Sequence, residues 1–208
     1  MTPVSQERQA LSDTMLAAGP DAPTLCNGWD VLDLAAHLVV REHRPDAAAS
    51  IAVPFLRGHL DRLMAAQVAD GLETVVGRFA AGPPPWSPFR LPGVDAAANL
   101  TEFVVHHEDV RRAGGAGPRA GVEELQEAVW TTLPRVALLA LRSTTVPVVA
   151  VHADGRRRVL HHGSYPVVLS GEPVELLLQL FGRGDEAEVD LGGPSLSVTR
   201  FRASDLGV

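Results

Sequence analysis

The fold and the chemistry of this chain centre on the stretch NLTEFVVHHEDVRRA, residues Asn99–Ala113. It places the carboxylate of Glu102 four residues before the imidazole of His106. Side chains four residues apart on an α-helix lie on the same face, one turn above the other. The two residues therefore form either a two-ligand clip for a divalent metal ion, or an exposed ion pair worth about 0.3–0.5 kcal/mol. A metal site needs a third ligand from elsewhere in the chain.

The rest of this stretch supports a helix over 95–114, ended by a pair of glycines. Asp109 continues the polar stripe one turn beyond His106. It is either the hydrogen-bond partner of a metal-bound imidazole or a simple surface carboxylate. Other polar residues of the stretch lie on different helical faces, and we expect them at the surface: His107, Glu108, Arg111 and Arg112.

A candidate third ligand lies on an earlier helix. An acidic capping pattern that begins at Asp30 predicts a helix over 31–44. His37 falls in the apolar stripe of that helix, so its side chain should point inward. A buried imidazole needs partners for both nitrogens, and a backbone carbonyl serves as well as a metal ion. The clip formed by Glu102 and His106 favours the metal.

Apolar periodicity and helix breakers predict further helices over 2–19, 51–70, 71–81 and 123–141. The period changes near 142–145, and short strands follow at 146–151, 157–160, 167–169, 189–191 and 196–198, with a helix at 172–181. Asp154–Gly155 predicts a hairpin turn. The expected fold class is therefore α+β with two domains: a four-helix bundle over 1–142 and a small α+β domain over 143–208.

Composition limits the class of protein. The chain has 208 residues, of which 46% are hydrophobic, so it can bury a sizeable core. The formal net charge of -7 argues against a nucleic-acid binder that relies on positive charge. Apolar runs are too short to cross a bilayer, and the polar beginning has no signal-peptide core, so we expect a cytoplasmic protein without a membrane partner.

The single cysteine, Cys26, excludes an internal disulfide and a zinc site built on cysteine pairs. We interpret it as a small packing residue. All 18 residues counted as Lys or Arg are arginine, and Ala, Gly and Pro are abundant. That usage indicates a genome rich in G and C.

Three separate segments resemble one known family. Residues 29–37, WDVLDLAAH, resemble the segment that carries the first metal histidine in the DinB-like superfamily, and Glu102–His106 resembles the segment with the later ligands. Residues 168–183, VLSGEPVELLLQLFGR, resemble the carboxy-terminal domain of mycothiol-dependent maleylpyruvate isomerase and its actinobacterial relatives. The resemblance spans nearly the whole chain.

The resemblance implies a metal held by His37, Glu102 and His106, usually zinc, although nickel or iron would accept the same donors. It also implies mycothiol as a thiol cofactor, activated as a thiolate by the metal. The function expected is a mycothiol-dependent transferase or isomerase acting on an electrophilic or acidic small molecule. The alternatives are a non-catalytic metal-binding or stress-related module and a metal-dependent hydrolase. The protein could be a monomer or a homodimer.

Other residues are candidates for contacts beyond the metal. Arg41, Arg111 and Arg183 are cations that suit an acidic substrate, although most arginines only solvate a surface. Trp86 lies in a proline-rich loop over 82–88, which either forms a pocket wall or covers the bundle. The sequence assigns no catalytic residue beyond the metal ligands.

Overall fold

The structure is a computed structural model that describes residues 1–44, 57–87 and 99–206. The chain divides into two compact units, Met1–Gly117 and Pro118–Val208. This division falls well before the boundary expected at 142–143. Helix α7 (Glu123–Ala140) packs against α8 (Pro173–Leu180) and against β2 (Arg157–His161), so it belongs to the second unit.

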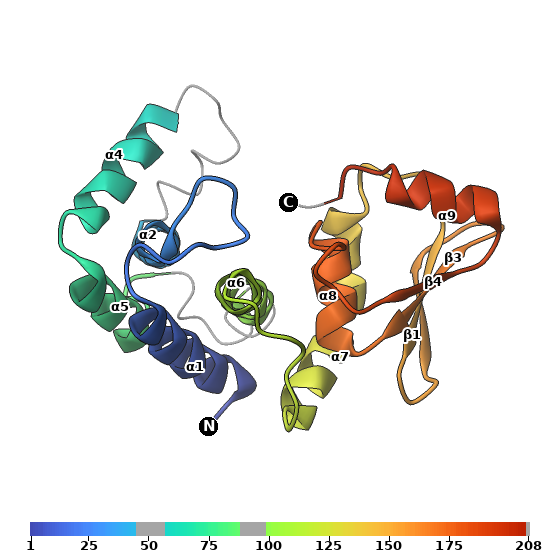
Figure 1. The fold of residues 1–208 in the computed structure, drawn as a ribbon, viewed down its shortest axis with the longest axis horizontal. Coiled ribbons are helices and arrows are strands. Elements are labelled where there is room, and N and C mark those ends of the chain that lie inside the picture. The colour runs from blue at the N-terminus through green and yellow to red at the C-terminus, as the bar shows by residue number, and fades with distance from the viewer. Residues whose placement is uncertain (45–56, 88–98, 207–208) are drawn as a thin grey trace. The chain divides into compact units, whose positions relative to one another are not determined.

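The first unit is helical. Its elements are α1 (Pro3–Ala18), α2 (Val31–His43), α4 (Arg57–Val68), α5 (Leu72–Ala81) and α6 (Leu100–Ala113). Helix α1 packs against α5 and α6, and α2 packs against α4 and α5 (Figure 1). The predicted helices over 2–19, 31–44 and 71–81 are confirmed to within a residue or two. The expected starts at 51 and 95 lie outside the described residues.

Helix packing in this unit follows the apolar periodicity of the sequence. The inward positions are fully buried and include these large side chains: Leu11, Met15, Leu34, Leu38, Phe79 and Phe103. The Phe79 and Phe103 rings meet edge to face, with centroids 5.1 Å apart, and so join α5 to α6. This core fixes the helices that carry the candidate metal ligands.

Helix α2 begins at the predicted acidic cap. The Asp30 carboxylate accepts a hydrogen bond from the Asp33 backbone N–H at 2.9 Å, and the Asp33 carboxylate accepts one from the Asp30 N–H at 3.4 Å. These reciprocal bonds satisfy backbone donors that the first helical turn leaves free. The cap therefore fixes where α2 starts, and with it the face of the helix on which His37 lies.

A buried ion pair joins three helices of the first unit. Arg8 on α1 makes two bonds to the Glu42 carboxylate on α2, at 2.6 and 2.7 Å, and a third to the Phe79 carbonyl on α5 at 2.8 Å. The guanidinium also lies over the Phe103 ring, 4.6 Å from its centroid. These contacts satisfy the charges, which would otherwise be expensive to bury.

The second unit combines helices with a four-stranded sheet. After α7 come β1 (Val148–His152), β2, β3 (Val167–Gly171), α8, β4 (Asp190–Gly192) and α9 (Ser195–Arg202). The strand order is β2-β1-β3-β4, with β1 parallel to β3 and the other neighbours antiparallel. Figure 1 shows α9 following β4 at the end of the chain. The mixed α and β composition is as expected, and the β1–β2 hairpin turns at Gly155, where φ is +92°.

One predicted strand is wrong. Residues 196–198 lie in α9, which starts after Pro194. Leu196 is 61% exposed, whereas Val198 is half-buried and Phe201 is buried. Val198 and Phe201 are three residues apart, so the inward positions follow helical spacing. Two apolar residues separated by one polar residue were too short a pattern to distinguish strand from helix.

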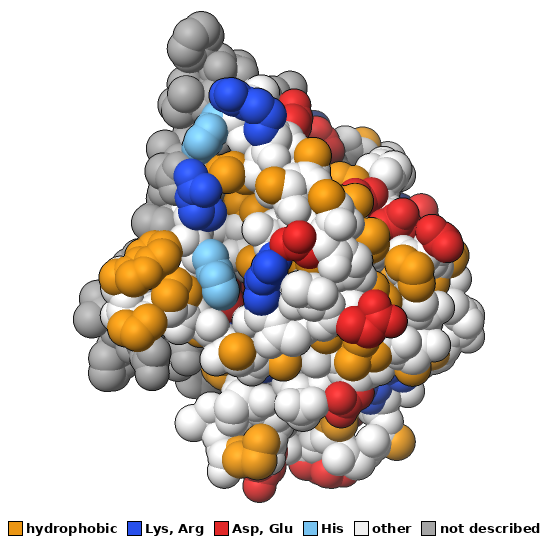
Figure 2. All heavy atoms as spheres, turned by 90° about the vertical axis from the view of Figure 1, so that its left-hand side faces the viewer, with side chains coloured by type: hydrophobic (Ala, Val, Ile, Leu, Met, Phe, Trp, Pro, Cys, Tyr) orange, Lys and Arg blue, Asp and Glu red, His pale blue; other side chains and the backbone are white. Residues whose placement is uncertain are grey.

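The described surface has mixed character. On the face drawn in Figure 2, basic and acidic side chains occur together with hydrophobic ones. Among the helices of the described ranges, none combines the length and the hydropathy that a membrane crossing requires.

Candidate metal centre

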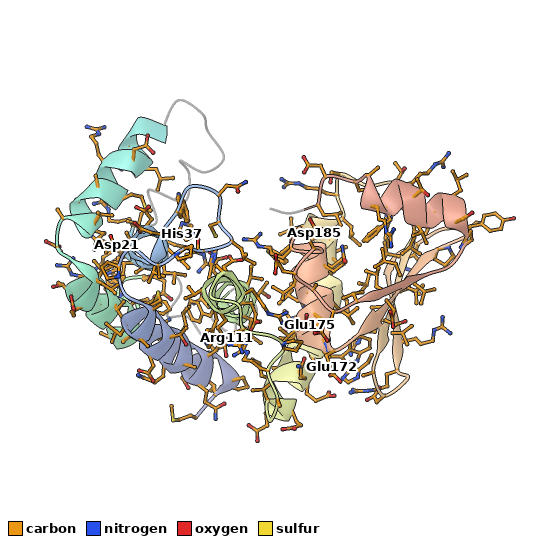
Figure 3. The ribbon with its side chains drawn as sticks, viewed as in Figure 1. Asp21, His37, Arg111, Glu172, Glu175 and Asp185 are labelled. Carbon is orange, nitrogen blue, oxygen red and sulfur yellow. The ribbon has the colours of Figure 1, made fainter. Side chains whose placement is uncertain are left out.

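Helices α2 and α6 bring the three predicted ligands together. Glu102 Oε1 lies 3.1 Å from His37 Nε2 and 3.3 Å from His106 Nε2. One ligand atom from each of the three residues lies within 4.8 Å of the other two. Figure 3 labels His37 on α2, the helix that supplies the first imidazole. The predicted convergence of these side chains is therefore observed, and their binding of a metal stays a prediction.

The arrangement fits a divalent ion. Zinc–nitrogen and zinc–oxygen bonds are about 2.0–2.2 Å long, which in a tetrahedron places neighbouring donors roughly 3.3 Å apart. The two contacts of Glu102 Oε1 are close to that spacing. The side chains of His37, Glu102 and His106 are 17%, 22% and 12% exposed, so the cluster is partly accessible to solvent. Two nitrogens and one oxygen leave room for a further ligand.

Electrostatic interactions favour an ionised carboxylate at the centre of the cluster. Burial raises the pKa of Glu102, but hydrogen bonds from His106 and His37 and the charge of Arg41 outweigh it, and that pKa lies well below its usual value. Burial lowers the pKa of His106, but hydrogen bonds with Asp109, Cys26 and Glu102 outweigh burial and raise that pKa well above its usual value. In the absence of an ion, Glu102 is therefore an anion and His106 holds its proton firmly. A metal ion bound at the same imidazole nitrogen would take the place of that proton.

Asp109 is the hydrogen-bond partner of His106. Its Oδ2 lies 2.9 Å from His106 Nδ1, and its side chain is completely buried. The surface alternative for Asp109 is therefore wrong. An ionised carboxylate only accepts hydrogen bonds, so Asp109 holds a proton on Nδ1 and turns Nε2 toward Glu102. Nε2 donates to Glu102 in the ion-free protein and would have to lose this proton to bind a metal ion.

Arg41 lies beside the carboxylate of the cluster. Its Nε is 3.4 Å from Glu102 Oε1, and its Nη1 donates to Asn99 Oδ1 at 2.5 Å. The buried Asn99 amide also donates to Glu42 Oε1 at 3.4 Å. Asn99 thereby connects the guanidinium of Arg41 to the buried ion pair formed by Arg8 and Glu42.

The other faces of α6 are not exposed as expected. His107, Glu108 and Arg112 are buried. The two nitrogens of His107 contact Glu7 Oε1 and Thr14 Oγ1 on α1, each at 2.8 Å. The expectation failed because polar residues usually indicate a surface, whereas here each is paired inside the protein.

Arg111 and Arg112 both bind the buried carboxylate of Glu108, at 2.8 and 2.7 Å. The sequence led us to expect all three residues at the surface. The two guanidinium groups compensate the charge of this completely buried carboxylate. Glu108 and Arg112 thus belong to the interior of the protein, and Arg111 is half-buried.

Two further candidates lie elsewhere. Trp86 is 63% exposed on the described surface. Arg183 belongs to the second unit, where its Nη1 donates to the carbonyl of Phe181 at 2.7 Å. Their contact with a substrate stays a prediction.

Sequence reasoning missed two neighbours of the histidines. Trp29 packs against His37, with ring centroids 5.0 Å apart. The thiol of Cys26 donates to Asp109 Oδ2 at 3.1 Å and lies 3.7 Å from His106 Nδ1. Trp29 stands within the segment that resembles the DinB-like family, but a lone cysteine in a loop offered no signal of this contact.

The chain was compared with known proteins by sequence and by structure. No family model and no curated protein sequence matches it. Its structure is similar to the crystal structure of a mycothiol-dependent maleylpyruvate isomerase, with a TM-score of 0.52 over 93% of this chain and 90% of that chain, at 14% identity. The chain has the fold of a mycothiol-dependent maleylpyruvate isomerase.

The same maleylpyruvate isomerase fold is matched in a mutant of that enzyme with a histidine replaced by alanine, with a TM-score of 0.51 and the same coverage and identity. The likeness covers both units of the present chain. At this identity it establishes the fold, and the chemistry has to be argued from the residues of the cluster.

Proposed function

We propose that this protein is a divalent-metal-dependent enzyme that uses a small thiol, mycothiol or a close analogue, to transfer or isomerise an electrophilic small molecule. The observation that carries the proposal is the meeting of His37, Glu102 and His106 at one point. The maleylpyruvate isomerase fold supports the thiol, because that enzyme is named as mycothiol-dependent. Zinc is the first choice of metal, and nickel suits the same donors.

Each residue of the cluster has a distinct part in this proposal. The two imidazoles and the carboxylate are the three protein ligands, and Asp109 holds His106 with Nε2 toward the ion. A metal with three protein ligands keeps a position for another ligand and lowers the pKa of a thiol that coordinates it. The negative charge of Glu102 offsets part of the charge of the ion.

Arg41 is the group that we assign to an acidic substrate. Its guanidinium lies beside Glu102 and is held by Asn99. A planar guanidinium can bind a carboxylate through two parallel hydrogen bonds. Arg41 would thus orient the acid group of the substrate next to the activated thiol.

The experiment that tests the proposal is a thermal-shift titration with mycothiol, before and after treatment with a chelator. A thiol present at about 100 times its dissociation constant stabilises the native state by about 2.7 kcal/mol. We expect a rise in Tm with the metal-loaded protein and none with the chelated protein. The His106→Ala variant should behave as the chelated protein does.

S-methylated mycothiol is the matched control ligand, because it keeps the sugar and loses the ionisable thiol. It should shift Tm much less than mycothiol. Equal shifts with both compounds, or a mycothiol shift that survives chelation, would contradict thiol activation by the metal. A metal-loaded protein that ignores mycothiol would instead favour one of the alternative functions.

A further inference from the structure

The loop Pro23–Trp29 between α1 and α2 is held firmly by its own hydrogen bonds. Thr24 Oγ1 donates to the carbonyl of Trp29 at 2.8 Å and accepts from the Cys26 N–H at 3.1 Å. The Trp29 N–H bonds back to the Cys26 carbonyl at 3.0 Å, which closes a tight turn. The Leu25 N–H donates to the Asp109 carbonyl at 3.1 Å and attaches the loop to α6.

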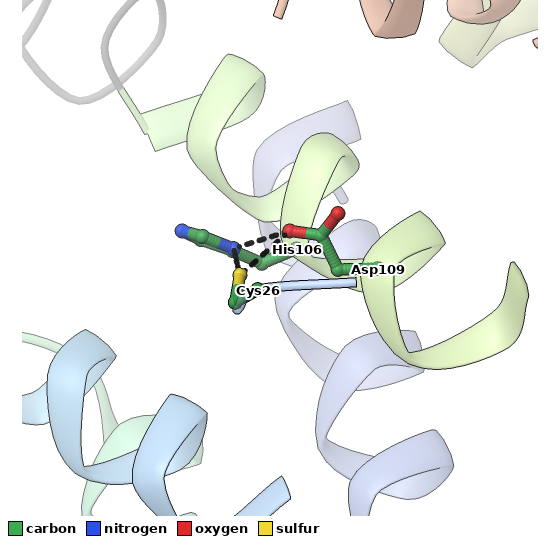
Figure 4. Close-up of side chains that lie close together, drawn as sticks. All are labelled: Cys26, His106 and Asp109. Atoms are coloured by element: carbon green, nitrogen blue, oxygen red, sulfur yellow. Dashed lines mark hydrogen bonds and ion pairs between the residues drawn. The ribbon is translucent and has the colours of Figure 1, made fainter. Parts of the chain in front are cut away.

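One end of this loop reaches the His106 side of the cluster. Figure 4 shows Cys26, His106 and Asp109 close together. Asp109 Oδ2 accepts from both Cys26 Sγ, at 3.1 Å, and His106 Nδ1, at 2.9 Å. The thiol therefore shares the carboxylate oxygen that orients the imidazole. A carboxylate that accepts two hydrogen bonds on one oxygen has less freedom to rotate than a carboxylate that accepts one hydrogen bond.

The other end of the loop reaches the His37 side. The Trp29 indole is tilted by 43° against the His37 imidazole, with centroids 5.0 Å apart. The same imidazole lies 5.4 Å from the His106 ring, in an edge-to-face arrangement. His37 thus contacts both an indole and the second imidazole, and these two contacts restrict rotation of its ring.

We infer that the loop Pro23–Trp29 sets the direction of both metal-binding imidazoles, with Cys26 and Trp29 as positioning residues. Cys26 acts through Asp109 on His106, and Trp29 acts directly on the ring of His37. The inference rests on the proposed function, because it assumes that these imidazoles hold a metal. It gives the cysteine a part in ordering the metal centre, in place of simple packing.

The test compares Cys26→Ala with Cys26→Ser and with Asn27→Ala in the full-length protein. Ala removes the donor to Asp109, whereas the Ser hydroxyl still donates. Asn27 is the matched control, because it lies next to Cys26 in the loop and is exposed. The measured quantities are the zinc dissociation constant, by competition with a chromophoric chelator, and the visible absorption spectrum of the cobalt-loaded protein.

We expect Cys26→Ala to weaken zinc binding by about 10-fold and to change the cobalt absorption bands. This is the smallest loss of metal affinity that is typical when a hydrogen-bond partner of a metal ligand is replaced. Cys26→Ser and Asn27→Ala should resemble the wild type in both measurements. The inference is overturned if Cys26→Ala matches Asn27→Ala, or if Cys26→Ser is as impaired as Cys26→Ala. A wild-type protein that binds no zinc or cobalt would refute the proposed function itself.

Trp29→Phe and Trp29→Ala extend the test to His37. The phenyl ring of Trp29→Phe still packs against the imidazole, so the cobalt spectrum should be unchanged. The zinc affinity should stay within about three-fold of the wild type, a smaller change than the loss of a hydrogen-bond partner of a metal ligand causes. Trp29→Ala should alter both if it folds by circular dichroism. A folded Trp29→Ala with an unaltered spectrum limits the inference to Cys26. If Trp29→Ala does not fold, Trp29→Leu takes its place, because it keeps an apolar side chain and removes the aromatic face, and its spectrum is judged in the same way.

Discussion

His37 Nε2 lies 3.1 Å from Glu102 Oε1, although 65 positions separate the two residues in the chain. The same oxygen lies 3.3 Å from His106 Nε2. Two imidazoles from different helices thus converge on one carboxylate oxygen. Because the side chain of Glu102 contacts both rings, it is the central member of the cluster.

Replacement of Glu102 by Gln should weaken metal binding more strongly than the 10–100-fold that is typical of changes outside the ligand set. The amide removes a negative charge and a strong donor oxygen while keeping the size of the side chain. Competition with a chromophoric chelator measures the effect. Glu124→Gln is the matched control, because Glu124 is an exposed acid at the start of α7. Equal zinc affinities in the two variants would show that Glu102 is not a ligand.

Asp109→Asn should reduce zinc affinity by about 10–100-fold. The buried carboxylate accepts from His106 Nδ1 at 2.9 Å, and an amide is a weaker acceptor for an imidazole N–H. The measurement is the zinc dissociation constant of the variant beside that of Asp21→Asn, which changes an exposed acid of the first unit. An unchanged constant in Asp109→Asn would remove the orienting role of this residue.

Arg8→Met should destabilise the protein by about 3–5 kcal/mol, because it leaves the carboxylate of Glu42 buried without its cation. Chemical denaturation gives the free energy of unfolding. The double variant Arg8→Met, Glu42→Leu should recover much of the loss, since both charges are then removed. Arg78→Ala breaks an exposed pair with Asp70 and should cost about 1 kcal/mol or less. Comparable losses in Arg8→Met and Arg78→Ala would contradict this account.

His43 should make stability depend on pH. Burial lowers the pKa of His43 in the folded protein, with a partial opposite effect from Glu42. In the unfolded chain, histidine has its ordinary pKa of about 6.5. Below that pH the unfolded chain therefore binds the proton more readily than the folded protein does. This contribution to stability is complete above that value and is lost as pH falls through the folded pKa.

His43→Gln removes the titrating group at this position. As pH falls from about 7.5 to 5, the free energy of unfolding of the variant should therefore rise relative to that of the wild type. Unfolding in urea at a series of pH values measures the difference. A difference that stays constant, or one that grows in favour of the wild type, would show that His43 does not titrate in this way.

Much of the site could be predicted from local patterns. The spacing of Glu102, His106 and Asp109 placed three polar groups on one face of α6, and the cap at Asp30 fixed the helix that carries His37. These features depend only on the spacing of residues within a single helix, and this spacing can be read from the sequence. The resemblance to known proteins then joined the two helices into one site.

Features that depend on tertiary packing could not be predicted. His107 is buried against α1, where its partners Glu7 and Thr14 lie. Glu108 is buried with the guanidinium groups of Arg111 and Arg112. The contact of Cys26 with Asp109 crosses 83 positions and has no periodic signal. The boundary near residue 117 lies in the glycine-rich stretch 114–121, GGAGPRAG, but the sequence offered a second signal in the change of period at 142–145. The packing of α7 against α8 and β2 decides between the two, and that packing is a tertiary feature.

The central claim is that one divalent metal ion is held by imidazoles from α2 and α6 together with the carboxylate of α6. Metal content per chain, by elemental analysis of protein purified in the presence of zinc, tests it most directly. We predict one zinc per chain in the wild type and in His162→Ala, whose exposed histidine lies in the second unit, and none in His37→Ala or His106→Ala. One zinc per chain in all four proteins would contradict the account.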